Sequence, residues 1–144
     1  PTGLTNDMVV VGYGASELED LLEEELNKNG RYINPDPNPD KGYFYRSDHI
    51  SFAKRGVPVL YADGGFDLVD GGKEAGFIIE EQYRLDAYHG VADEYDESWN
   101  LDGLNQSIDV IFNISNELAN NSQWPNWYEG NEFKSIRDNS RSGK

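Results

Sequence analysis

Two histidines, His49 and His89, are the side chains of this sequence best suited to bind a metal or to move a proton near neutral pH. His49 follows Asp48 at the start of a predicted helix, where its ring suits a ligand, a general base or a structural cap. His89 follows Tyr88 in a segment predicted to be irregular, and Asp93 lies four residues further along. A loop histidine near a carboxylate fits a metal ligand whose position a second residue maintains, which makes His89 the better metal candidate.

Composition excludes several classes of function. Cysteine is absent, so disulfides, thiolate zinc sites and a thiol nucleophile are excluded. The 144 residues include 12 basic and 27 acidic side chains, a formal net charge of −15. Such a surface repels the phosphates of nucleic acids and of anionic membranes, so we expect neither as a partner. No apolar run approaches the roughly 20 residues of a membrane span, and no signal segment is visible in this sequence.

Short apolar runs alternate with helical patterns around these histidines. Strands are predicted at 9–11 and 57–62. Helices are predicted at 16–30, 48–55 and 102–118, the last with an apolar stripe of Leu104, Ile108, Ile111, Phe112, Ser115 and Leu118. Residues 34–40, 64–76 and 83–102 are predicted to be irregular. The alternation indicates an α/β sheet, and so few strands leave an exposed edge through which we expect self-association.

Two further patterns resemble known binding loops. Residues 12–14 form a G-x-G turn between a strand and a helix, which is typical of dinucleotide-binding proteins. Glu17 occupies the third glycine position, however, and its charge would repel a pyrophosphate. Residues 36–42 carry alternating oxygens as a calcium loop does, but Lys41 and Ser47 stand where an EF-hand needs glycine and glutamate. We interpret these segments as a tight turn and a rigid surface loop.

Three segments resemble parts of the M28 family of metallopeptidases. Residues 43–60 read YFYRSDHISFAKRGVPVL, which is similar to the family's S-D-H-x-x-F-x-x-x-G-x-P element. Tyr88, His89 and Asp93 match its late Y-H-x-x-x-D element, in the right order and at a fitting distance. Residues 124–133 are similar to a tail found in bacterial secreted members. The resemblance spans nearly the whole chain.

The resemblance implies a zinc-dependent aminopeptidase that hydrolyses peptides at two zinc ions. The family's ligands are a histidine, a bridging aspartate, a glutamate, an aspartate and a final histidine. The final histidine corresponds to His89, and Tyr88 corresponds to a tyrosine that hydrogen-bonds the developing oxyanion. Asp48 and Asp93 correspond to supporting residues near the site. Neither His49 nor Asp7 is assigned as a zinc ligand.

The resemblance also implies part of a three-layer αβα fold with a mixed sheet, in which residues 1–144 are the C-terminal portion of one peptidase domain. The other four ligands and the general-base glutamate would precede Pro1. We therefore expect a fold incomplete at its N-terminus and a chain that retains no zinc and has no activity alone. A secreted or periplasmic location is expected for the parent protein.

Two other functions stay open on the sequence alone. M28-like domains that have lost their metals serve as scaffolds or interaction modules. Glutaminyl cyclases are zinc acyltransferases that share the core, although they usually carry tryptophan where this chain has Tyr88.

Overall fold

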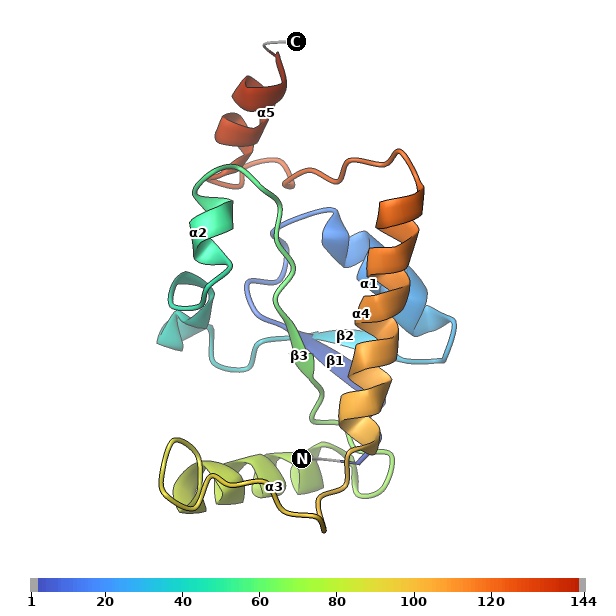
Figure 1. Cartoon of the computed structure of the whole chain (residues 1–144), viewed down its shortest axis with the longest axis vertical. Coiled ribbons are helices and arrows are strands. Elements are labelled where there is room, and N and C mark those ends of the chain that lie inside the picture. The colour runs from blue at the N-terminus through green and yellow to red at the C-terminus, as the bar shows by residue number, and fades with distance from the viewer. Residues whose placement is uncertain (1–2, 143–144) are drawn as a thin grey trace.

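A mixed three-stranded sheet forms the centre of the computed structural model, which describes residues 3–142 (Figure 1). The central strand is β1 (Asp7–Val10). It pairs in parallel with β2 (Tyr32–Pro35) and antiparallel with β3 (Ala62–Gly64). All four residues of β1 are buried, because the sheet is covered on both faces at this strand. The predicted mixed α/β sheet is thus confirmed.

Two helices cover one face of the sheet. Helix α1 (Leu18–Asn27) and helix α4 (Asp102–Asn120) pack against β1 and against each other. Leucines recur on α1 at helical spacing and thereby form an apolar face toward the strand. Six buried side chains make up this part of the core: Met8, Val10, Leu22, Leu26, Val110 and Ile114.

A second apolar cluster joins the C-terminal segment to the sheet. It contains Val11, Ala15, Phe44, Ala53, Trp127 and Phe133. The 3₁₀ turn η2 (Tyr43–Tyr45) contributes Phe44 and the short helix α2 (Ile50–Ala53) contributes Ala53. A second 3₁₀ turn, η1 (Pro39–Lys41), precedes them and has no buried residue. The Trp127 indole is buried and donates a 3.1 Å hydrogen bond to the Gly56 carbonyl, which anchors the chain ahead of α5 (Lys134–Ser142).

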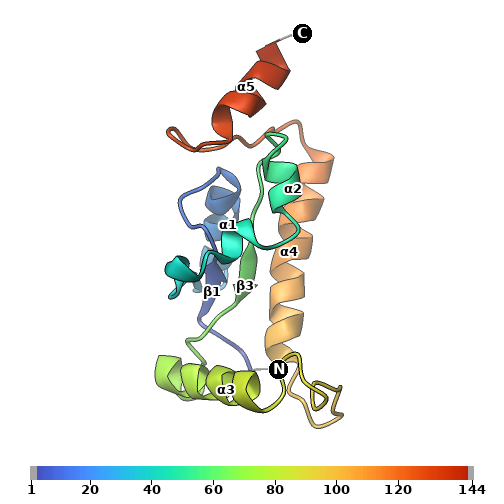
Figure 2. The same ribbon diagram turned by 90° about the vertical axis from the view of Figure 1, so that its left-hand side faces the viewer.

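Helix α3 (Gly72–Asp86) lies at the opposite end of the molecule from α5, as Figures 1 and 2 both show. Only Gly76 of this helix is buried. A side chain there would place its Cβ 2.0 Å from the Phe66 carbonyl oxygen, so glycine allows this close approach. Phe77, Ile78 and Ile79 are all exposed, and α3 therefore contributes no large side chain to the core.

Several predicted boundaries were wrong. The stretch at 34–40 was predicted to be a loop, but its first two residues belong to β2, which pairs with β1. Residues 57–61 belong to no strand, and β3 begins only at Ala62. Helix α3 overlaps the segments predicted to be irregular at 64–76 and 83–102. The sequence did not predict this helix because the two glycines at its start have low helix propensity. Among residues 3–142, no helix is both long and apolar enough to span a membrane.

Candidate functional site

A tight loop after α3 brings Tyr88, His89 and Asp93 together. The helix ends where the N–H groups of Ala87 and Tyr88 both donate to the Tyr83 carbonyl, at 2.9 and 3.0 Å. His89 follows with φ 58°, and it is the one non-glycine residue with positive φ in the described part of the chain. This left-handed conformation costs a residue with a Cβ about 1–2 kcal/mol. The surrounding hydrogen bonds must therefore hold His89 in place.

The Asp93 carboxylate closes the loop. It accepts a 3.0 Å hydrogen bond from the His89 backbone N–H and a 2.5 Å bond from the Tyr83 hydroxyl. These two hydrogen bonds, of which the one from Tyr83 has the larger effect, hold the pKa of Asp93 below its usual value. The same bond raises the pKa of the Tyr83 hydroxyl. Asp93 is thus a positioning residue that keeps its charge and fixes the backbone at His89.

The His89 ring lies against the ring of Tyr88. Their centroids are 3.9 Å apart and their planes differ by 19°, which is a stacked arrangement. Both side chains are exposed, Tyr88 by 54%. The imidazole is therefore neither packed in the core nor covered by neighbouring elements, and it is accessible to a metal or another group from outside.

Asp48 lies on a different element, in the turn that leads into α2. Its side chain is exposed, and Figure 1 shows α2 well away from α3. The loop that carries His89 follows α3 directly. The structure thus joins Tyr88, His89 and Asp93, whereas Asp48 is not part of that group.

His49 is a packed residue. Its ring lies edge-on between Phe44 and Tyr61, with centroid distances of 4.7 and 5.1 Å. Burial lowers its pKa, although the Phe44 backbone and Asp48 act in the opposite direction. Its Nε2 atom is buried and has no hydrogen-bond partner within residues 3–142. Of the three roles open from the sequence, these contacts support a structural one.

The described residues do not form a zinc site by themselves. Within residues 3–142, no three histidine, aspartate, glutamate or cysteine side chains lie close enough together to hold a metal ion. Asp7, the acid nearest the start of the first strand, is fully buried. Its carboxylate accepts bonds from the Asn34 amide at 2.5 Å and the Asp67 N–H at 2.8 Å. Asp7 is thus a structural residue.

The G-x-G turn binds a carboxylate of the chain itself. The Glu19 side chain is 5% exposed and accepts hydrogen bonds from the N–H groups of Gly14 and Ala15, at 2.8 and 2.7 Å. A dinucleotide would place its pyrophosphate against such N–H groups at the start of a helix. Because Glu19 already occupies this position, the turn is structural. The Ser16 hydroxyl donates to the Val59 carbonyl at 3.0 Å, so it does not cap α1.

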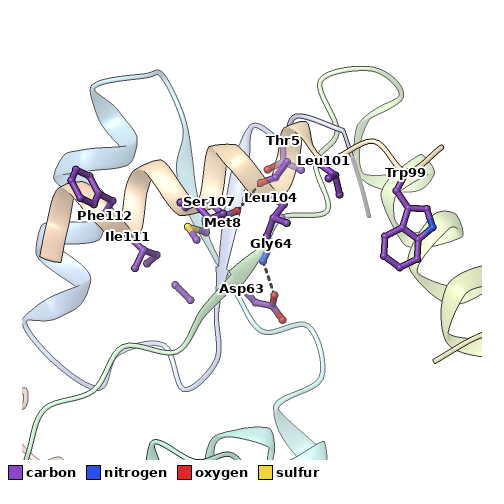
Figure 3. A pocket seen from close by; sticks show the side chains of 14 residues that line it. Thr5, Met8, Asp63, Gly64, Trp99, Leu101, Leu104, Ser107, Ile111 and Phe112 are labelled. Carbon is purple, nitrogen blue, oxygen red and sulfur yellow. Dashed lines mark hydrogen bonds between the residues drawn. The ribbon is translucent and has the colours of Figure 1, made fainter. Parts of the chain in front are cut away.

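An apolar groove of about 730 Å³ opens between α4 and β3 (Figure 3). Its walls include Leu104, Ile108, Ile111 and Phe112 of α4, with Met8 beneath them. The apolar stripe that the sequence predicts along this helix therefore lies largely outside the core. The buried residues of α4 are Gly103, Val110 and Ile114.

Comparison with known proteins adds one match. A model of the family described as "Peptidase family M28" matches residues 2–115, which include both Asp48 and the loop at 88–93. No curated protein matches the chain, and no solved structure does.

Proposed function

The chain belongs to peptidase family M28, and we propose that it takes part in peptide-bond hydrolysis as a portion of a zinc-dependent aminopeptidase. In this proposal His89 is one ligand of a dinuclear zinc centre, and the Tyr88 hydroxyl donates to the oxyanion of the substrate. Asp93 holds the loop, and Asp48 supports the site from another element. The substrate is the free amino end of a peptide.

The observation that carries the proposal is the conformation of His89. An exposed histidine held at φ 58° by Asp93 buries no side chain in the core that would offset its strained backbone. Strain of this kind collects at functional sites, where the surrounding structure maintains it. The family match includes this loop, so a role for the ring in the peptidase site explains both facts.

A single imidazole does not hold zinc firmly without further donors. The described part of the chain supplies no group of three, so these residues alone do not fit a zinc centre and no catalytic step is assigned to them. We therefore place the other ligands and the general base in polypeptide outside this sequence. The 144 residues alone are expected to hydrolyse no peptide.

The test is a hydrolysis assay on the full-length polypeptide that carries this chain, with leucine p-nitroanilide as substrate. Tyr88→Phe is expected to lower kcat by about 10²-fold or more, as loss of one oxyanion donor does. Tyr95→Phe is the matched control, because it removes a hydroxyl from another exposed tyrosine of the same region. Equal activity of the two variants would remove Tyr88 from the site.

The same assay on the isolated 144 residues is a second test. Chelator-sensitive turnover by the 144 residues alone would show that the other ligands are not needed, contrary to the proposal.

A secreted or periplasmic location also belongs to the proposal, and the tail at 124–133 supports it. Fractionation of cells that express the full-length protein tests this location.

A further inference from the structure

The guanidinium of Arg31 is a buried charge with one nitrogen that has no partner. Arg31 follows the end of α1 and is 5% exposed. Its Nε atom donates to the Thr5 carbonyl at 3.0 Å, and its Nη2 atom donates to the Thr5 hydroxyl at 3.1 Å and to the Asp7 carbonyl at 2.7 Å. The third nitrogen, Nη1, is buried and has no hydrogen-bond partner within residues 3–142. Because the guanidinium is planar, Nη1 lies on the side opposite to the Nε–H group.

No acceptor of Arg31 carries a charge. The two carbonyls and the hydroxyl are neutral, and Arg31 is in none of the four ion pairs among residues 3–142. Burial lowers the pKa of Arg31, although the Asp7 carboxylate acts in the opposite direction. A guanidinium stays protonated at neutral pH, so the positive charge remains inside the protein. Such a charge lowers stability unless an anionic group pairs with it.

A small pocket of about 190 Å³ opens beside Arg31, between the end of α1 and α4, which pack against each other (Figure 1). Glu25 lines it from α1, and Gln106, Asp109 and Asn113 line it from α4. Its volume equals that of about six water molecules in the liquid. Pockets for drug-sized ligands are larger, at about 300 Å³ or more. The pocket therefore suits a small polar molecule.

Hydrogen bonds within the chain hold two walls of this pocket in place. The Gln106 side chain accepts the Thr5 N–H at 3.1 Å and donates to the Thr5 carbonyl at 3.2 Å. The Glu25 carboxylate accepts bonds from Lys28 and from the Asn113 amide, both at 2.6 Å. Both Glu25 oxygens are thus already bound, and Lys28 compensates the Glu25 charge.

Asp109 and Arg31 are the charged side chains that line the pocket without an ion-pair partner among residues 3–142. Their charges are opposite. A simple anion would be attracted by Arg31 but repelled by Asp109, and a simple cation would meet the reverse. A molecule that carries a carboxylate and an ammonium group matches both side chains.

We propose that this pocket binds a free α-amino acid with a small side chain, whose carboxylate pairs with Arg31 and whose ammonium group pairs with Asp109. Hydrogen bonds between charged groups are roughly twice as strong as those between neutral groups, so the two contacts select a zwitterion. No residue of the loop at 88–93 lines the pocket. The site is therefore separate from the proposed peptidase site and does not depend on it.

Equilibrium dialysis of the full-length polypeptide with ¹⁴C-labelled L-alanine tests the proposal. Zinc is first removed with 1,10-phenanthroline, because amino acids also bind zinc, and circular dichroism verifies the fold afterwards. We expect saturable binding of one alanine per chain, with half-saturation at about 1 mM or below. Unlabelled glycine should compete with it. L-Alaninamide lacks the carboxylate and acetate lacks the ammonium group, so both should compete at least about 5-fold more weakly.

Variants locate the bound alanine. Asp109 is exposed, so Asp109→Asn should fold normally and should weaken binding about 5-fold, as loss of an exposed ion pair does. Asp102→Asn is the matched control, because Asp102 is an exposed aspartate on the same helix that does not line the pocket. Arg31→Met removes the buried charge and should abolish binding. Should Arg31→Met fail to fold, Asp109→Asn still decides the question.

Three results would overturn the proposal. The first is the absence of saturable alanine binding to the folded polypeptide. The second is equal affinity of Asp109→Asn and Asp102→Asn for alanine. The third is competition by acetate or L-alaninamide as strong as that by glycine, which would show that the site recognises one charge and not a zwitterion. None of these results bears on His89, so the proposed peptidase function is tested separately.

Discussion

Replacing Glu19 by alanine tests the buried turn that connects β1 to α1. The Glu19 carboxylate accepts the N–H groups of Gly14 and Ala15, and Ala15 is buried. Hydrogen bonds to a charged group contribute about 1.5–3 kcal/mol each, and an unsatisfied buried donor costs about 1–3 kcal/mol. Gly14 is exposed, so water replaces the carboxylate there at small cost. The expected loss in the free energy of unfolding is about 3 kcal/mol, mostly from Ala15.

Glu19→Gln refines this estimate. The two N–H groups are bound by different carboxylate oxygens, and an amide retains only one acceptor. The glutamine variant is therefore expected to lose about half as much stability as the alanine variant.

Urea and thermal unfolding, followed by far-UV circular dichroism, measure both changes. About 3 kcal/mol corresponds to a fall in Tm of about 6–12 °C for a chain of this size. Glu23→Ala is the control, because Glu23 is an exposed acid on the same helix. Its effect is expected to stay within about 0.5 kcal/mol. If Glu19→Ala and Glu23→Ala unfold at the same urea concentration, the carboxylate does not satisfy the turn and the reasoning is refuted.

Three further changes test other parts of the structure. Burial lowers the pKa of His49 below its usual 6.5, so at slightly acidic pH the unfolded chain binds a proton that the folded chain does not. The free energy of unfolding is therefore expected to fall as the pH drops below about 6.5. Thermal melts between pH 7 and 5 should show a weaker dependence of stability on pH in His49→Gln. Gly56→Ala would place a Cβ 2.7 Å from the Arg137 nitrogen at φ 80°, so it should detach the tail and shift tryptophan emission to the red. The control Gly130→Ala, at φ 86° with open space around it, should cost only about 1 kcal/mol. Asp93→Asn should speed exchange of the His89 amide by about 10-fold, whereas equal exchange rates would show that Asp93 does not hold the loop.

Motifs in the sequence led to the correct family and fold class. Apolar spacing also located α1 and α4, because both helices have a strong periodic pattern. The same spacing placed Ile108 and Phe112 on one apolar stripe, but it does not report what covers that side of the helix. The large buried side chains of α4, Val110 and Ile114, lie on the adjoining face.

Other features depend on contacts that spacing does not reveal. Helix α3 begins with two glycines and packs through Gly76, so its apolar residues show no clear stripe. Strand β2 contains a proline at its end and is defined by pairing with β1. The grouping of Tyr88, His89 and Asp93 was expected from the family motif, but the positive φ of His89 follows from the Asp93 hydrogen bond and has no signal in residue types.

The metal content of the full-length polypeptide tests the role of His89 most directly. After dialysis against metal-free buffer, plasma emission spectroscopy counts zinc per chain in the wild type and in His89→Ala. His49→Ala serves as the control, because that ring packs between Phe44 and Tyr61 and is assigned no metal. We expect about two zinc ions in the wild type and the control, and at least one fewer in His89→Ala. Equal zinc in all three proteins would contradict the assignment of His89 as a ligand.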